Sequence, residues 1–148
     1  MRKISKHIAT LFFVGYIPFA QGTLASLLAI PVYLAVKNNL PVYFSLTVFL
    51  LAVGFWAAGV AEKDFSRKDP HQIVIDEFAS MLLVYLFVPF SMKALVIGFV
   101  LFRFFDVFKI PLLKKAETLP RGFGIMLDDI GAAILANLCL RAFAFFVK

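Results

Sequence analysis

Charged side chains are scarce in this chain of 148 residues, at 16% of the sequence, whereas hydrophobic residues make up 62%. A soluble domain of this size needs more polar side chains to cover its outside, so the composition argues against one. The mean hydropathy of +0.93 places the chain among integral membrane proteins. We therefore expect one membrane-embedded, all-α domain over residues 1–148.

Cysteine is also nearly absent, and the single Cys139 excludes an intrachain disulfide. The formal net charge of +6 does not indicate a nucleic-acid partner, because no basic helix interleaved with aromatic residues and no nucleic-acid motif is present. In a membrane protein the placement of Lys and Arg matters more than their sum. The basic residues 2–6 resemble the start of a signal peptide, but Gly15, Pro18 and the polar Gln21 favour a retained segment.

Apolar segments separated by short polar turns predict a polytopic helical bundle of about four or five membrane-spanning helices. The segments are 24–36, 42–61, 73–90, 94–107 and 125–146. The second of them has no charge and is long enough to cross a hydrocarbon core of roughly 30 Å. Residues 8–19 are too short at about 1.5 Å per residue. They predict a re-entrant or interfacial piece, followed by non-helical backbone at Gly22 and Thr23.

Basic residues gather in the N-terminus and in two long loops, 62–72 and 109–123. The positive-inside rule places these segments in the cytoplasm. Two predicted crossings separate the loops, which agrees with both lying on one side. The N-terminus shares that side only if residues 8–19 enter the membrane and return. We expect a multi-pass protein of the inner (cytoplasmic) membrane whose site faces the cytoplasm, with His71 facing solvent.

The residues that carry chemistry fall at the cytoplasmic ends of the predicted segments. They are Thr23, Asp69, Asp76, Glu77, Arg103, Asp106, Lys109, Asp128 and Asp129. Four carboxylates at two helix starts, Asp76, Glu77, Asp128 and Asp129, predict an oxygen site for a hard cation, most simply Mg²⁺. Arg103 and Lys109 share one helix face with Asp106 and could grip a phosphate. This combination is typical of phosphoryl transfer or phosphate-ester hydrolysis.

Each of these features also has a simpler interpretation. An acidic residue in the first turn of a helix interacts favourably with the helix dipole and needs no metal. Arg103 and Asp106 could form an intrahelical ion pair, whether or not they also line a site. The simpler interpretations do not explain why all the charged groups converge on one face.

At these residues the sequence resembles the phosphatidylglycerophosphatase A family, over about Gly15–Asn137. The motifs are Gly22-Thr23 with Ser26, Asp69-Pro70 leading to Ile73-Val74-Ile75-Asp76-Glu77, Phe102-Arg103-Phe104-Phe105-Asp106 with Lys109, and Leu119-Pro120-x-Gly122-x-Gly124-Ile125-Met126-x-Asp128-Asp129. The resemblance implies an α-helical membrane enzyme that removes the terminal phosphate of phosphatidylglycerophosphate with Mg²⁺, giving phosphatidylglycerol.

The resulting hypothesis gives each residue a role. Asp76, Glu77, Asp128 and Asp129 would hold the metal, and one of them could act as general base. Arg103 and Lys109 would bind the phosphate. Asp69 and Asp106 would orient partners or complete the metal shell. Thr23 would line the pocket. A metal-activated water is the expected nucleophile, because the chain has neither Cys-x5-Arg nor Asp-x-Asp-x-Thr.

Two alternative functions stay open at this point. The first is a phosphatase for another membrane phospholipid or an isoprenoid phosphate, because the acid set does not discriminate among headgroups. The second is a small ion or proton transporter. A transporter predicts charges through the bilayer depth, whereas the charges here gather on one side.

Overall fold

The computed structural model describes residues 2–65, 70–108, 119 and 122–146. These residues form six α-helices and one 3-10 helix, with no strand among them, so the predicted all-α class is confirmed. The elements are α1 (Arg2–Ala9), η1 (Val14–Tyr16), α2 (Gln21–Val36), α3 (Leu40–Phe65), α4 (Ile75–Val84), α5 (Met92–Val107) and α7 (Phe123–Phe146).

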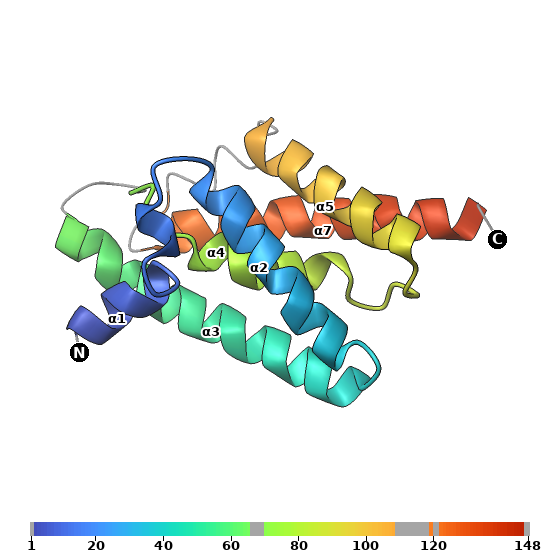
Figure 1. Cartoon of the computed structure of the whole chain (residues 1–148), viewed down its shortest axis with the longest axis horizontal. Helices are drawn as coiled ribbons and strands as arrows, with labels where there is room; N and C mark the ends of the chain where they lie inside the picture. Colours follow the sequence, from blue (N-terminus) through green and yellow to red (C-terminus); the bar gives the residue numbers. More distant parts are fainter. Residues whose placement is uncertain (1, 66–69, 109–118, 120–121, 147–148) are drawn as a thin grey trace.

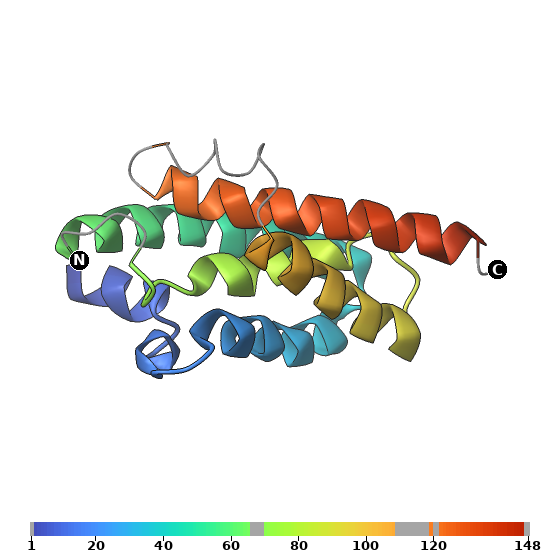
Figure 2. The same cartoon turned by 90° about the horizontal axis from the view of Figure 1, so that it is seen from above.

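The short helix α4 is the centre of the bundle. It contacts α1, α2, α3, α5 and α7, which is every other α-helix that the structure describes. The longer helices α3 and α7 run along the long axis of the molecule and flank α4 (Figure 1). Seen from above, α4 lies between α7 on one side and α2 on the other (Figure 2). The position of α4 therefore depends on side chains from all of its neighbours.

The apolar segment 73–90, predicted as one crossing helix, is helical only over Ile75–Val84. The chain leaves the helix there, and Phe87 has a left-handed φ of 60°. The last carbonyls of a helix have no partner within it. The side-chain amide of Asn137 on α7 donates hydrogen bonds to the carbonyl oxygens of Leu83, Val84 and Leu86, at 3.3, 2.9 and 2.9 Å. This amide allows α4 to end inside the bundle.

Tyrosines fill much of the core beside the C-terminal half of α4. The rings of Tyr33 and Tyr85 are stacked with their centroids 4.6 Å apart. The Tyr85 hydroxyl donates to the carbonyl of Leu95 at 2.7 Å. The Tyr43 hydroxyl donates to a carbonyl of α4, that of Leu82. The hydroxyls of Tyr43 and Tyr85 are thus satisfied by backbone carbonyls, which allows these two large side chains to be buried.

Two helices, α3 and residues 123–143 of α7, are long and apolar enough to cross a membrane. The helix α2 is apolar but shorter. Large apolar side chains of α3 are exposed, among them Phe44, Val48, Phe49 and Trp56. The prediction of about four or five spanning helices is not confirmed. One reason is that the ten residues of α4 extend only about 15 Å, roughly half of a hydrocarbon core.

Residues 8–19 do not form a single helix. After α1 ends at Ala9, the backbone takes left-handed φ angles at Leu11, Phe12 and Phe13 before η1. The expectation of non-helical backbone at Gly22 and Thr23 was wrong, because α2 begins at Gln21 and the break falls at Ala20, whose φ is 52°. An interfacial location of this segment stays a prediction.

Candidate active site

A cavity of about 310 Å³ lies at the N-terminal end of α4. Six carboxylates line it, those of Glu62, Asp76, Glu77, Asp106, Asp128 and Asp129. Among the described residues the only Lys or Arg side chain lining it is that of Arg103. Asp76 and Glu77 stand in the first turn of α4, whereas Asp128 and Asp129 lie in α7. The helix ends therefore bring together residues that are far apart in the sequence.

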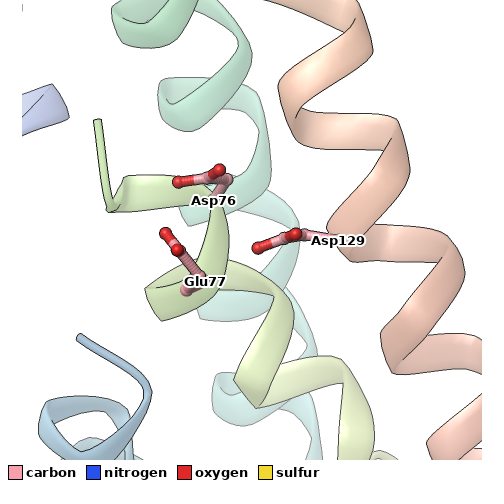
Figure 3. A group of neighbouring side chains, drawn as sticks. All are labelled: Asp76, Glu77 and Asp129. Atoms are coloured by element: carbon pink, nitrogen blue, oxygen red, sulfur yellow. The ribbon is translucent and has the colours of Figure 1, made fainter. Parts of the chain in front are cut away.

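Three carboxylates from two helices point toward one another in this cavity. Figure 3 shows Asp76 and Glu77 on α4 facing Asp129 on α7. Each offers an oxygen atom, and the three oxygens lie within 4.8 Å of one another. A second group with the same spacing consists of Asp106, Asp128 and Asp129. Asp129 belongs to both groups.

The carboxylates are buried more deeply than their charge would ordinarily allow. Asp76, Asp128 and Asp129 are only 6%, 4% and 4% exposed. The Oε2 atom of Glu77 and the Oδ2 atom of Asp129 make no hydrogen bond with any residue that the structure describes. Burying a carboxylate oxygen without a partner is costly, and a hard cation with oxygen ligands removes that cost. The donor set thus fits a divalent cation of the Mg²⁺ type.

Arg103 is held in place by its own helix. Its Nη1 atom lies 2.6 Å from Oδ2 of Asp106, three residues further along α5, so the predicted ion pair is confirmed. Gly22 at the start of α2 lies against the same groups. A Cβ atom at Gly22 would be 2.2 Å from Oε1 of Glu77 and 3.3 Å from Nη1 of Arg103. Only a residue without a side chain lets α2 approach this closely.

Glu62, in the last turn of α3, connects the cavity to the start of α7. Its Oε2 atom accepts a hydrogen bond of 2.6 Å from the backbone N–H of Gly122. Gly122 has a φ of 73°, and a Cβ there would lie 2.4 Å from the backbone nitrogen of Gly59. Glycine is required at 122 by both conformation and space. Glu62 therefore fixes the backbone shortly before Asp128 and Asp129.

The residues predicted from the sequence fall into three groups. Six of them line the one cavity: Asp76, Glu77, Arg103, Asp106, Asp128 and Asp129. Thr23 is half-buried in the first turn of α2 but is not among the residues that line the cavity, whereas its neighbour Gly22 is. Asp69 and Lys109 lie outside the described residues.

A comparison with protein families identifies the family of this chain. The family model described as Phosphatidylglycerophosphatase A matches residues 7–144. The chain belongs to the phosphatidylglycerophosphatase A family. Proteins that carry this name are lipid phosphatases, so the expectation of a lipid phosphatase is confirmed at the level of the family. No solved structure matches the chain.

Relatives of the chain carry two different names. A phosphatidylglycerophosphatase A of Haemophilus influenzae is 32% identical over 144 residues, which cover 95% of this chain and 88% of the relative. The one of Escherichia coli is 32% identical over 132 residues, covering 87% and 77%. A protein of Bacteroides thetaiotaomicron named as a candidate phosphatidylinositol-3-phosphatase is 33% identical over 142 residues, covering 90% and 89%.

Two titratable cavity residues of this phosphatidylglycerophosphatase A family member, Glu62 and His71, were not among the predicted site residues. Glu62 falls in a segment that was interpreted as a polar loop, but α3 continues to Phe65 and carries this carboxylate to the cavity. An acidic residue directly after a long apolar run is the signal that could have identified it. His71, which was expected to face solvent, is exposed and also lines the cavity.

Proposed function

We propose that this chain hydrolyses the terminal phosphate monoester of phosphatidylglycerophosphate, giving phosphatidylglycerol and phosphate, with Mg²⁺ at the cytoplasmic face of the membrane. The observation that carries the proposal is the cavity at the start of α4, where six carboxylates surround Arg103. Membership of the phosphatidylglycerophosphatase A family, with two relatives of that name, supports the choice of substrate.

Asp76, Glu77, Asp128 and Asp129 would hold the cation, since they are carboxylates that meet from two helices, with Glu77 partly buried and the three aspartates buried. When bound, Mg²⁺ supplies positive charge beside the phosphate and lowers the pKa of a water molecule. The oxygen-only donor set suits a hard cation rather than a thiolate-binding metal.

The chain itself would bind and orient the phosphate. Arg103 presents a planar fork of N–H donors that matches two phosphate oxygens, and its ion pair with Asp106 fixes the fork in the cavity. Lys109 would add a second positive charge. Asp69 and Thr23 would complete the substrate-binding surface.

The reaction requires one proton to move. The oxygen of water forms a bond to phosphorus, and the bond from phosphorus to the glycerol oxygen breaks. A carboxylate of the cavity would take the proton from water and deliver it to the departing glycerol oxygen. The oxygens of each group of carboxylates lie within 4.8 Å of one another, which supports one carboxylate serving both oxygens in this proposal.

The proposed location follows from the distribution of apolar and basic residues. Two apolar helices, α3 and α7, support insertion into a membrane. The basic residues of the N-terminus and the long loops support a cytoplasmic orientation of the acidic end of α4. The phosphate of a lipid headgroup would then meet the cavity at the surface of the bilayer.

A second candidate is suggested by the Bacteroides relative. Its name refers to a phosphatidylinositol 3-phosphatase, and it covers 90% of this chain. The chemistry is the same, because both lipids carry a phosphate monoester on a polyol headgroup. The acidic groups and Arg103 act on the phosphate and do not choose between the headgroups.

The test is phosphate release by the purified protein in mixed micelles. Phosphatidylglycerophosphate, phosphatidylinositol 3-phosphate and phosphatidic acid are compared, each with Mg²⁺ and with EDTA. We expect release from the first lipid and only with Mg²⁺. Release from the inositol lipid alone would move the function to the second candidate, and no release from any of them would refute both.

Variants connect this activity to the cavity. Loss of residues that merely orient a metal ligand costs 10–100-fold in activity, so Asp129→Asn should lower turnover by more than about a hundredfold. Asp64→Asn makes the same change in the last turns of α3, away from the cavity, and should retain normal turnover. Near-normal activity of folded Asp129→Asn would remove Asp129 from the site.

A further inference from the structure

Asp129 is shared by two groups of carboxylates in the cavity. In one it meets Asp76 and Glu77 of α4, and in the other it meets Asp106 of α5 and Asp128 of α7. In each group three oxygens lie within 4.8 Å of one another. The two groups therefore meet at one side chain and approach it from different helices.

The charge in the cavity exceeds what one divalent cation offsets. Six carboxylates line it, and Arg103 is the only described residue that contributes a guanidinium to the lining. One divalent cation together with Arg103 and the Lys109 proposed above balances four of the six negative charges when all six carboxylates are ionised. A phosphate monoester adds about 1.5 to 2 further negative charges. A site with a single cation would thus repel the group it has to bind.

The burial of Asp129 points the same way. Its side chain is 4% exposed, and its Oδ2 atom makes no hydrogen bond with any described residue. A carboxylate has two oxygens and can therefore serve two cations at once. Arg103 already neutralises Asp106 in part, at 2.6 Å, so the guanidinium is not available to balance the whole second group.

We propose that the chain binds two divalent cations that share Asp129, one with Asp76 and Glu77 and the other with Asp106 and Asp128. This inference rests on the proposed function and extends it to a class of mechanism. In two-cation sites the ions lie about 3.5–4 Å apart and stabilise the attacking and leaving oxygens of a phosphoryl transfer. The second cation would also bind a carboxylate oxygen of Asp106. N–H donors of Arg103 would then be free to bind the phosphate.

The test counts ions and does not depend on turnover. The full-length protein in detergent micelles is titrated with Mn²⁺, and bound metal is followed by electron paramagnetic resonance. We expect two ions per chain and the spectrum of a magnetically coupled pair, since such ions are about 4 Å apart. One ion per chain, or two ions without coupling, would overturn the proposal.

Three variants assign the ions to their groups. Glu77→Gln and Asp106→Asn should each reduce bound Mn²⁺ from two ions to one and abolish the coupling. Asp64→Asn, outside the cavity, should retain two coupled ions. Two coupled ions in folded Asp106→Asn would overturn the assignment. Helix content by circular dichroism identifies a variant that fails to fold, and the coupled spectrum of the unmodified chain decides the proposal in that case.

The same preparation separates this inference from the function on which it rests. Phosphate release with one bound ion retains the phosphatase and overturns the shared site. Two coupled ions without release from any of the three lipids retain the metal site and overturn the proposed reaction.

Discussion

Gly22 and Glu77 are in contact across the start of two helices: a Cβ atom at Gly22 would lie 2.2 Å from Oε1 of Glu77. We predict that Gly22→Ala displaces either the start of α2 or the carboxylate. Misplacement of a reacting group by 1 Å can cost about a hundredfold in rate, and we expect a fall of that order in kcat. The measurement is phosphate release at saturating lipid.

A matched substitution distinguishes this effect from overpacking in general. A Cβ at Gly54 would lie 2.8 Å from Cε of Met126, the flexible end of a side chain outside the acidic groups. Overpacking costs typically about 1–3 kcal/mol of stability. Gly54→Ala should therefore lower Tm but retain most of kcat. Equal kcat in the two variants would contradict a specific role of the contact between Gly22 and Glu77.

The guanidinium of Arg103 should not be replaceable by an ammonium. Arg103→Lys keeps the charge but loses the planar fork that fits two phosphate oxygens. Removing one preorganised donor costs about 10²–10³ in kcat, and we expect a loss in kcat/KM of that size. The exposed Arg141 on α7 provides the control, because Arg141→Lys changes the same group away from the cavity. A folded Arg103→Lys with normal kcat/KM would exclude the proposed phosphate fork.

Glu62 can be tested by the hydrogen bond that it accepts. The amide oxygen of Glu62→Gln can still accept from the N–H of Gly122, whereas Glu62→Ala cannot. If Glu62 positions the start of α7, the Gln variant retains activity within a few-fold and the Ala variant loses about 10–100-fold, the range for residues that orient a ligand. Equal losses in both variants would show that the negative charge of Glu62 matters instead.

Asn137 should matter for stability rather than for chemistry. Asn137→Asp keeps the size of the side chain but removes the donors that reach three carbonyls at and just beyond the end of α4. Leaving buried groups unsatisfied costs about 1–3 kcal/mol each. We expect a lower Tm, measured by circular dichroism in detergent. The exposed Asn38 in the turn before α3 gives the control, since Asn38→Asp should leave Tm unchanged.

The same amide explains which part of the fold the sequence could not predict. The long apolar runs identify α3 and α7, because a helix of that length is specified by its own composition. The run 73–90 looks like another such helix, but α4 ends at Val84. Its end is stabilised by Asn137, more than fifty residues away, and no local pattern carries that information.

The cavity was easier to anticipate than the contacts that shape it. Asp76, Glu77, Arg103, Asp128 and Asp129 stand at the ends of apolar segments, and a membrane topology brings such ends to one side. Glu62 also follows an apolar segment, so its position could have been predicted, but its hydrogen bond could not, because the partner is a backbone N–H sixty residues further along the chain. Backbone donors leave no signature in a sequence unless the fold is known.

The early end of α4 has a consequence for the membrane as an electrical barrier. The acidic groups stand at one end of α4, and the other end is closed by Asn137 and packed tyrosines. For a protein embedded as proposed, the packed core beyond α4 would stop water and ions that enter the cavity from passing further than the length of this short helix. A cell can then keep a strongly charged hydrolase in its membrane without providing a leak for protons through it.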